Sequence, residues 1–528
     1  MRVTSLWCAA NARGSPITPP THSELRRGAA VASMMRRLSM LCLALLATVP
    51  AGASTPGIGN DLPSIGSAGG ATISRDQEYQ LGRMVVQGLR DQGQILDDPE
   101  INDYIQNLGS RIASQAQESP QRFQFFVVRD QRINAFALPG GFIGVNQGLI
   151  TTTANEAQLA SVLAHEIAHV TQRHIARSIE AQGRQGMASA AAMLAAILIG
   201  AVTGTPDAAM AGMAVAQGTA AQAQINFTRD NEYEADRIGI GFLAAAGFDP
   251  NAMPDFFETL GRRTGPSIYQ APEFLQTHPV SANRIAESRD RAALLKPSVT
   301  VESQSYAFIR ERIRVIGAEE DADLRKYYAA LADTRPLTPA QRYGDSLARL
   351  GAGDRERAAS ALIELAAAQP QSPMLQAALG QAQFAAGWPD LALHTLRSAL
   401  EVAPRNVPLT IRYAEVLMRT GDAKRAHQIL LDLFNNVPPT PEQIRLTALA
   451  ANAAGDTADA YYYMAEYHIA TGDLPLAVKQ LELALADPVI SSVQRSRFEA
   501  RSKEVREALA SNRKHRDRSR PDADKMTP

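Results

Sequence analysis

The hydrophobic positions of the first part of the chain with regular structure follow a helical spacing. Between Glu78 and Ala116, apolar residues recur at intervals of three and four, and the polar run 97–99 interrupts them. Residues at that spacing share one face of an α-helix. The proline that ends the polar run disfavours helical geometry in the residue before it. We therefore expect two amphipathic helices, with order beginning near Ile73.

Two further segments have the composition of strands. Residues 123–128 and 135–145 are rich in Phe, Val and Ile; a polar turn at 129–132 separates them, and a Pro-Gly-Gly sequence at 139–141 interrupts the second. Aromatic and β-branched residues suit a pleated, half-buried surface. We expect them to form a small antiparallel sheet beside the helices.

Two longer helices are predicted downstream of these strands. Thr153 and Glu156 have the spacing of a capping box and predict a helix that runs to about Ala181. A second helix is expected from Thr228 to Ala245. These elements make an α+β domain, which we place at residues 73–305.

An Ala-, Met- and Gly-rich stretch between these two helices, residues 187–218, has Asp207 as its one charged residue. We interpret it as a packed helical hairpin broken near Pro206, because Ala and Gly favour membrane insertion only weakly. The alternative is a lid or a peripheral contact with a membrane.

From Tyr343 onward the sequence repeats with a period of 34 residues. Each of three units has a glycine, a small residue five positions later, a leucine nine positions later and a proline seventeen positions later. These residues are Gly353, Gly387 and Gly421; Ala358, Ala392 and Ala426; Leu362, Leu396 and Leu430; and Pro370, Pro404 and Pro438. Gly455 continues the interval, and Gly472 begins a copy half a period out of step, as one extra helix would cause.

This periodic pattern resembles the tetratricopeptide repeat, whose paired helices stack and bury their apolar faces against neighbouring repeats. Such stacks are concave and bind protein segments. The fold class is therefore mainly α: the α+β domain, then an α-solenoid of these repeats at residues 306–510. Residues 511–528 are charged and poor in apolar residues, so we expect a disordered tail.

The N-terminal segment has the pattern of a signal peptide. Basic residues at 36–37 precede an apolar run at 38–49, and small residues at 51–53 follow, so cleavage is expected near Ala53. The run is too short to span a membrane comfortably. Residues 1–33 are interpreted as an extension upstream of the true start, and residues 54–72 as a flexible linker. The alternative for the apolar run is a buried N-terminal helix, but we expect a secreted protein.

Cysteine content and charge exclude several classes of function. Cys8 and Cys42 both lie in the part expected to be removed, so we expect neither disulfides nor thiolate metal ligands in the mature protein. The formal net charge is -1, which provides no global field that would attract nucleic acid. We therefore expect no nucleic-acid partner.

The candidate chemistry lies in the sequence His-Glu-Ile-Ala-His at residues 165–169. On a helix, His165 and His169 stand about 40° apart and can bind one metal ion. Glu166 lies beside them, where a general base can reach a water molecule. A helix with these side chains on its surface is the alternative, but the apolar flanks predict burial. His174 lies about 140° from His169 on the same helix, so we expect a surface or second-face histidine.

Two histidines leave a third ligand to be supplied by another segment. Glu232, on the expected second helix, is the best candidate. Asp236 follows one turn later on the same face, where it can accept a hydrogen bond from the free ring nitrogen of a ligating histidine. The alternative, a solvated charged face, fits Glu234 better than Glu232.

Two further sequences accompany these motifs: Asn-Ala-Phe-Ala-Leu-Pro-Gly-Gly at 134–141, and Thr-His-Pro at 277–279 followed by Arg284. Together they resemble the HtpX and CAAX-prenyl-protease family of zinc endopeptidases. The resemblance covers roughly residues 73–510. Because it combines a signal peptide with helical repeats, the sequence is similar to the periplasmic branch of that family. Clear transmembrane spans, which the integral-membrane relatives have, are lacking in this sequence.

The resemblance implies a role for each matching residue. One Zn²⁺ per chain would be bound by His165, His169 and Glu232, with Glu166 as the base and Asp236 as the partner of a ligand. Asn134 would lie on an edge strand that faces the substrate backbone, and His278 and Arg284 would stabilise the oxyanion. His278 is also expected as a fourth ligand that occupies the open position in an inactive state.

The implied function is quality control of outer-membrane protein assembly in the periplasm. Substrates would add as a strand to residues 133–138, and the repeats would choose which proteins are presented. Expected partners are outer-membrane β-barrel proteins and their assembly machinery. Two alternatives remain: a repeat-based chaperone or scaffold with a largely repressed zinc site, and a structural zinc site without hydrolysis.

Overall fold

The computed structural model describes residues 74–116, 122–181, 229–263, 272–295, 303–318 and 321–518. The predicted signal peptide, the linker, both cysteines and the apolar stretch 187–218 lie outside these residues. Within the described ranges, no helix is long and apolar enough to cross a membrane.

The two predicted N-terminal helices are α2 (Arg75–Asp91) and α3 (Pro99–Ala113). The side chain of Ser74 caps α2, and that of Asp98 caps α3 by accepting a hydrogen bond from the backbone N–H of Ile101. Pro99 occupies the first turn of α3, where a missing N–H costs nothing. The predicted division near residues 97–99 is confirmed.

The sheet has three strands, β1 (Gln124–Val128), β2 (Ala135–Leu138) and β3 (Phe142–Asn146), in the order β1-β3-β2. β2 and β3 are antiparallel, but β1 and β3 are parallel, so the expectation of a wholly antiparallel sheet was wrong. Gly140 and Gly141 both have positive φ and turn the chain between β2 and β3. The chain forms β2 at one edge of the sheet and then turns back, so that β3 lies between β2 and β1 and runs in the same direction as β1.

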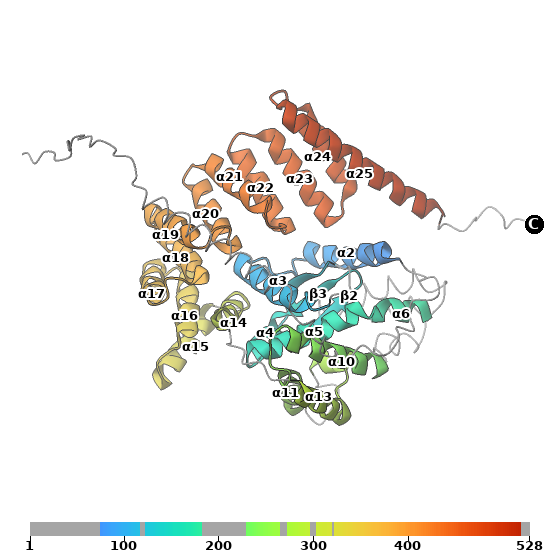
Figure 1. Ribbon diagram of the computed structural model, residues 1–528. Coiled ribbons are helices and arrows are strands. Elements are labelled where there is room, and N and C mark those ends of the chain that lie inside the picture. Colours follow the sequence, from blue (N-terminus) through green and yellow to red (C-terminus); the bar gives the residue numbers. More distant parts are fainter. Residues whose placement is uncertain are drawn as a thin grey trace, which may run out of the picture. The chain divides into compact units, whose positions relative to one another are not determined.

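Both faces of this sheet are buried, and alternate residues face opposite sides. Phe126 and Val128 of β1 pack with Leu89 and other apolar residues of α2. Phe125 and Val127 belong to the main core, which contains the apolar faces of α3 and of the helix that follows the sheet. The sheet therefore lies between α2 on one side and the main helical core on the other (Figure 1).

After the sheet come α4 (Gln147–Thr152), α5 (Glu156–Thr171) and α6 (His174–Ala181). The cap of α5 is Asn155, not Thr153, whose hydroxyl is hydrogen-bonded to the carbonyl of Ile150 and to a tyrosine hydroxyl. The predicted single helix to Ala181 was also wrong. Arg173 has φ 53°, a left-handed conformation that ends the first helix and redirects the chain before α6 begins.

The main core also contains α10 (Arg229–Ala245), α11 (Ala252–Arg263) and α14 (Gln304–Ile316), and two further helices are α12 (Glu273–Thr277) and α13 (Ala282–Leu294). The predicted helix to Ala245 is confirmed as α10, which lies beside α5 (Figure 1). Gly239 permits this approach, because a Cβ atom there would lie 3.1 Å from the backbone of Ala164 and His165. A larger side chain would push α10 away from α5.

The rest of the described chain is a series of paired helices. They are α15 (Asp321–Thr334), α16 (Pro339–Gly351), α17 (Arg355–Ala368), α18 (Pro373–Ala385), α19 (Pro389–Val402), α20 (Val407–Arg419), α21 (Ala423–Phe434), α22 (Pro441–Ala453), α23 (Thr457–Thr471), α24 (Leu474–Ala486) and α25 (Ser492–Arg518). Four of the periodic glycines lie in the turns within helix pairs, and their φ values are 82° to 94°. The alanines and leucines predicted to recur inside the repeats are completely buried. The mainly α fold and the repeat architecture are confirmed.

The out-of-step copy also has a structural explanation. Helix α23 follows Gly455 and ends at Gly472, so it is the second helix of one pair and the first helix of the next. Helix α25 extends to Arg518 and so includes residues 511–518 of the predicted tail, whose disorder stays a prediction. Residues 519–528 lie outside the described part.

Helix α14 lies where the two predicted domains meet. Its Tyr306 belongs to the main core, whereas Phe308 packs with the first repeats. Arg312 forms ion pairs with Asp98 and Glu100 at the start of α3. Because one helix contributes to both cores, the boundary at 305/306 stays a prediction.

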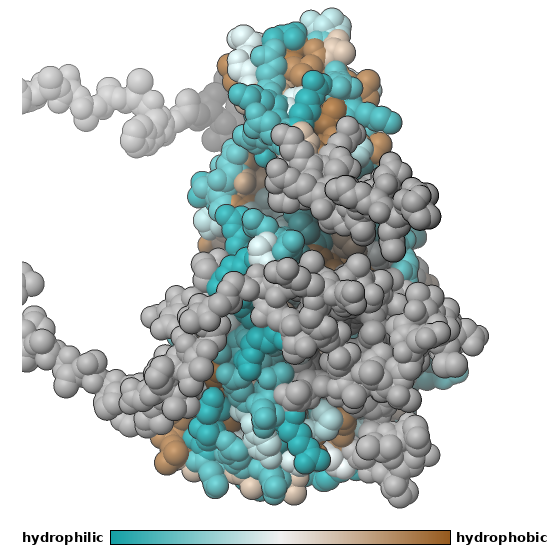
Figure 2. Space-filling view, turned by 90° about the vertical axis from the view of Figure 1, so that its right-hand side faces the viewer, coloured by the Kyte–Doolittle hydropathy of each residue, from teal (hydrophilic) through white to brown (hydrophobic). Residues whose placement is uncertain are grey.

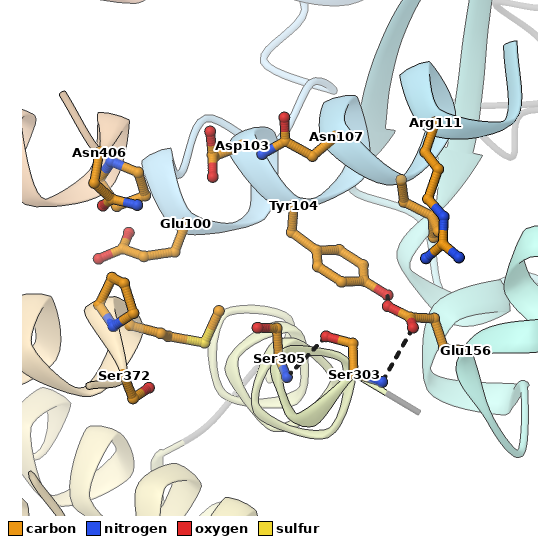
Figure 3. A pocket seen from close by; sticks show the side chains of 14 residues that line it. Glu100, Asp103, Tyr104, Asn107, Arg111, Glu156, Ser303, Ser305, Ser372 and Asn406 are labelled. Carbon is orange, nitrogen blue, oxygen red and sulfur yellow. Dashed lines mark hydrogen bonds between the residues drawn. The ribbon is translucent and has the colours of Figure 1, made fainter. Parts of the chain in front are cut away.

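A cavity of about 310 Å³ lies between α3, α14 and the repeat helices α18 and α20. In it, Glu156 accepts hydrogen bonds from the Tyr104 hydroxyl and the backbone N–H of Ser303 (Figure 3). Asp103 lines the same cavity near Glu100. The hydrogen bonds of Glu156 connect α5 with α3 and with the residue that precedes α14. None of the predicted site residues lines this cavity.

Large hydrophobic side chains are scattered over the described surface. The more exposed of them are Met84, Leu294, Leu391, Val402, Val489 and Val493. The face in Figure 2 shows hydrophobic residues among many hydrophilic ones wherever described residues are visible.

Candidate metal centre

His165 and His169 both project from α5 into one buried cluster, and each side chain is about 1% exposed. Their Nε2 atoms lie 3.0 Å apart. One helical turn separates the two residues, so the predicted helical spacing places both rings on the same side. The structure therefore brings these two predicted ligands together.

Helix α10 supplies the third predicted ligand, Glu232. Its two carboxylate oxygens lie 3.5 Å from the Nε2 atoms of His165 and His169. Burial opposes ionisation, but the imidazoles of His278 and His165 hold the pKa of Glu232 well below its usual range. The group is therefore an anion at neutral pH and can bind a cation.

His278, at the C-terminal end of α12, completes the cluster. Its Nδ1 atom lies 3.0 Å from Glu232 and 3.4 Å from His165, and its Nε2 atom lies 3.6 Å from Glu166. The ring stacks on Phe274, with 4.9 Å between the ring centroids. It therefore faces the base and the ligands together.

The arrangement of these atoms fits a metal ion. One nitrogen or oxygen from each of His165, His169, Glu232 and His278 lies within 4.8 Å of the others, and all four residues are buried. Tetrahedral bonds of about 2.0–2.2 Å would separate neighbouring ligand atoms by roughly 3.3 Å, close to the spacings seen here. Nitrogen and oxygen donors without thiolates suit a divalent transition metal.

The electrostatic surroundings of the cluster also favour a cation. Burial by itself would lower the pKa of His165, but hydrogen bonds with Asp236 and Glu232 raise it to about 10. Burial holds the pKa of His169 well below its usual range. The cluster thus stabilises positive charge beside neutral His169, and a metal ion supplies such charge without a proton.

Glu166 lies on the same turn of α5 and is completely buried. Neither carboxylate oxygen hydrogen-bonds a side chain in the described part of the chain. Burial raises the pKa of Glu166. A buried carboxyl group without such a partner, next to a cation site, can accept a proton.

Asp236 and Arg284 lie behind the ligands. Asp236 Oδ1 is 3.0 Å from Nδ1 of His165, the distance expected of a partner that orients a ligand. Arg284 donates two hydrogen bonds to Asp236, of 2.7 and 2.8 Å, and its Nη1 atom lies 2.8 Å from Glu232. This guanidinium is thus committed to the two carboxylates, which favours a structural role over the expected one of stabilising an oxyanion.

Asn134 immediately precedes the edge strand β2 and is 5% exposed. Its amide nitrogen donates a hydrogen bond to Glu273, and its amide oxygen has no hydrogen-bond partner among the described residues. The residue therefore lies at the predicted strand edge, with one buried polar atom that has no hydrogen-bond partner in the described chain.

His174 was expected as a surface or second-face histidine, and the surface alternative was wrong. Its side chain is completely buried, and its Nδ1 atom lies 2.8 Å from Nδ1 of His169. Glu234, expected on a solvated face, lies 3.1 Å from its other nitrogen. The helical projection failed because the helix ends before His174, and no periodic signal in the sequence marks that break.

The fold and this site define a metallopeptidase that carries tetratricopeptide repeats. The pattern of Peptidase family M48 matches residues 99–292, and that of the tetratricopeptide repeat matches residues 383–452. A relative from Vibrio cholerae serotype O1 is 35% identical over 88% of this chain and 96% of its own length. The β-barrel assembly-enhancing protease of Yersinia pestis is 34% identical over 89% of this chain and 97% of its own, and that of Escherichia coli K12 is 32% identical over 90% and 98%. The chain therefore belongs to the family of β-barrel assembly-enhancing proteases and is a metalloprotease.

Proposed function

We propose that the protein is a zinc-dependent endopeptidase of the periplasm that takes part in quality control of outer-membrane protein assembly. The observation that carries the proposal is the convergence of two imidazoles and Glu232 next to the buried base Glu166. Closed structural zinc sites usually use cysteine, and an adjacent carboxylate that is not itself a ligand favours hydrolysis.

In this proposal His165, His169 and Glu232 hold one Zn²⁺, which would polarise the scissile carbonyl and make water more acidic. Glu166 accepts the proton of the attacking water and delivers it to the leaving amine. Asp236 keeps the proton of His165 on Nδ1, so that Nε2 faces the cluster. Arg284 holds both carboxylates of α10 in place.

His278 has two proposed roles that follow from its position between Glu232 and Glu166. It stabilises the oxyanion when substrate is bound, or it fills the open ligand position in an inactive state. Substitution by alanine separates the two. The first role predicts a loss of peptide hydrolysis, and the second predicts a gain.

Substrate binding is proposed at β2, which pairs with β3 on one side only within the described chain. A peptide added there as a further strand gains main-chain hydrogen bonds without strong sequence preference. Asn134 at the start of the strand contributes a polar contact. The repeats supply a second point of attachment and raise the local concentration of the bound protein.

The cellular setting is proposed from two observations. The basic and apolar pattern of residues 34–53 is typical of a cleaved export signal. The relatives that match nearly the whole chain are named for enhancing β-barrel assembly. We therefore propose outer-membrane β-barrel proteins and their assembly machinery as partners.

The substitution Glu166→Gln tests the enzymatic proposal. It removes the base and keeps the size of the side chain and the three ligands, so proteolysis of an unfolded β-barrel substrate should fall by at least about 10²-fold. Zinc content, measured by atomic emission, should stay at one ion per chain. Unchanged proteolysis would contradict the assignment of Glu166.

A repeat-based chaperone or assembly scaffold is the second candidate, and the extended repeat region favours it. The same variant distinguishes the two functions in cells. Full rescue of outer-membrane assembly by Glu166→Gln would favour the scaffold, whereas accumulation of trapped, uncleaved substrates would favour the protease.

A further inference from the structure

His174 lies directly behind the candidate metal ligand His169. Helix α5 ends at Thr171, and α6 begins at His174 itself. Its imidazole is completely buried and spans from Nδ1 of His169, 2.8 Å away, to Oε2 of Glu234, 3.1 Å away. Glu234 is on α10, so three elements meet at this ring.

The backbone turn that produces this arrangement is stabilised from a fourth element. Arg173 adopts the left-handed conformation, which few non-glycine residues occupy. Its guanidinium forms an ion pair with Glu78 of α2, a carboxylate that is only 5% exposed, and the Nε hydrogen bond is 2.8 Å long. A partly buried ion pair thus stabilises the conformation that carries His174 toward His169.

The chemistry of two facing imidazoles determines where their protons lie. A neutral imidazole has one N–H and one lone pair, so two Nδ1 atoms at hydrogen-bond distance must include one donor and one acceptor. If His169 carries its proton on Nδ1, its Nε2 lone pair faces His165 and Glu232. His174 then accepts at Nδ1 and carries its own proton on Nε2, where Glu234 accepts it. The opposite tautomer of His169 would place a proton in the cluster.

We propose that His174 is a positioning residue that fixes the metal-binding tautomer and orientation of His169, and that Glu234 fixes His174 in turn. This inference rests on the proposed function, in which His169 is a ligand. Helix α10 then orients both histidines of α5, because Asp236 contacts His165 directly and Glu234 acts on His169 through His174. Partners of this kind typically change metal affinity by about 10–100-fold.

The test is the zinc affinity of the full mature chain, measured by competition with a chromogenic chelator. His174→Phe fills the space without hydrogen bonds and should raise the zinc Kd by about 10–100-fold. His174→Gln offers one acceptor and one donor in a similar span and should stay within about threefold of the wild type. Glu234→Leu should weaken binding, and Glu234→Gln, which keeps an acceptor, should have little effect. His427→Phe in the repeats is the control for loss of a buried histidine.

Thermal unfolding of each zinc-free variant separates ligand positioning from folding. Equal zinc Kd values for His174→Phe and the wild type would overturn the proposal. So would equally weak binding by the Phe and Gln variants when both fold, because a side chain that restores one donor and one acceptor would then fail to restore zinc binding. If the wild type itself binds no zinc, the proposed metalloprotease site fails, which is a different outcome from failure of the role of His174.

Discussion

At the scale of single residues, the site is an assembly of buried charges that compensate one another. Arg284 is 2% exposed and contacts both carboxylates of α10 that face the cluster. Burial opposes ionisation of Asp236, but hydrogen bonds from His165 and Arg284 lower its pKa. Buried ions of this kind depend strongly on every partner, because water cannot replace a missing one.

Arg284→Met should therefore destabilise the metal-free protein by about 3–5 kcal/mol, because two buried carboxylates lose their cation. Urea unfolding measures the loss. The matched control is Arg291→Met on the same helix, whose exposed pair with Glu287 should contribute less than about 1 kcal/mol. Similar losses in the two variants would contradict the structural role of Arg284. Addition of zinc should reduce the loss, because a bound cation compensates Glu232.

At the scale of elements, helix α3 illustrates how one helix serves two environments. Its apolar face, including Ile101, Ile105 and Leu108, belongs to the main core. Its opposite face presents Asp103 to the cavity in Figure 3. Burial, with a further contribution from the charge of Glu100, raises the pKa of Asp103 to about 6, while a hydrogen bond with Asn107 opposes the shift. Ionised Asp103 therefore costs stability at neutral pH.

Asp103→Asn should stabilise the protein in a pH-dependent way. The folded state binds the Asp103 proton more tightly than the unfolded state, so the stability of the wild type falls as pH rises from about 4 to 6. Above about pH 6 the loss of stability that Asp103 causes no longer changes with pH. The substitution should recover at most roughly 3 kcal/mol at pH 7 and less than about 1 kcal/mol at pH 4. Urea unfolding of both proteins at pH 7 and at pH 4 measures these differences in stability. The exposed Asp323→Asn is the control, and a gain from Asp103→Asn that does not depend on pH would argue against the assignment.

At the scale of the whole molecule, buried ion pairs connect the catalytic domain to the repeats. Arg412 of α20 donates hydrogen bonds of 3.1 and 2.8 Å to Glu100 of α3, and Arg312 of α14 contacts the same carboxylate at 2.9 Å. Arg312 also forms a bidentate pair with Asp98, whose pKa is lowered to about 2 despite its burial. These ion pairs therefore fasten α20 of the repeats to α3 and α14.

Arg412→Met should loosen this connection and cost about 2–5 kcal/mol, because the buried carboxylate of Glu100 loses one of its cationic partners. Hydrogen exchange should rise in α3 and α20 together. Arg342→Met, which breaks the exposed pair with Glu364 inside the repeats, should cost less than about 1 kcal/mol. The double variant Glu100→Gln with Arg412→Met should recover part of the loss, and a strictly additive result would exclude coupling between the two side chains.

The sequence by itself determined the parts of this protein that repeat or follow one helix. The period of 34 residues predicted the turns at Gly353 and Gly421, and the helical spacing of His165 and His169 predicted their shared face. Such patterns are readable because neighbours along one regular element have fixed relative directions.

Tertiary structure alone decided what depends on separate elements meeting. The parallel pairing of β1 with β3, the conformation of Arg173 and the burial of His174 all follow from contacts across the fold. The commitment of Arg284 to two carboxylates is of the same kind. A local sequence pattern specifies the direction of a side chain within its own element, but it does not specify which groups other elements bring against it.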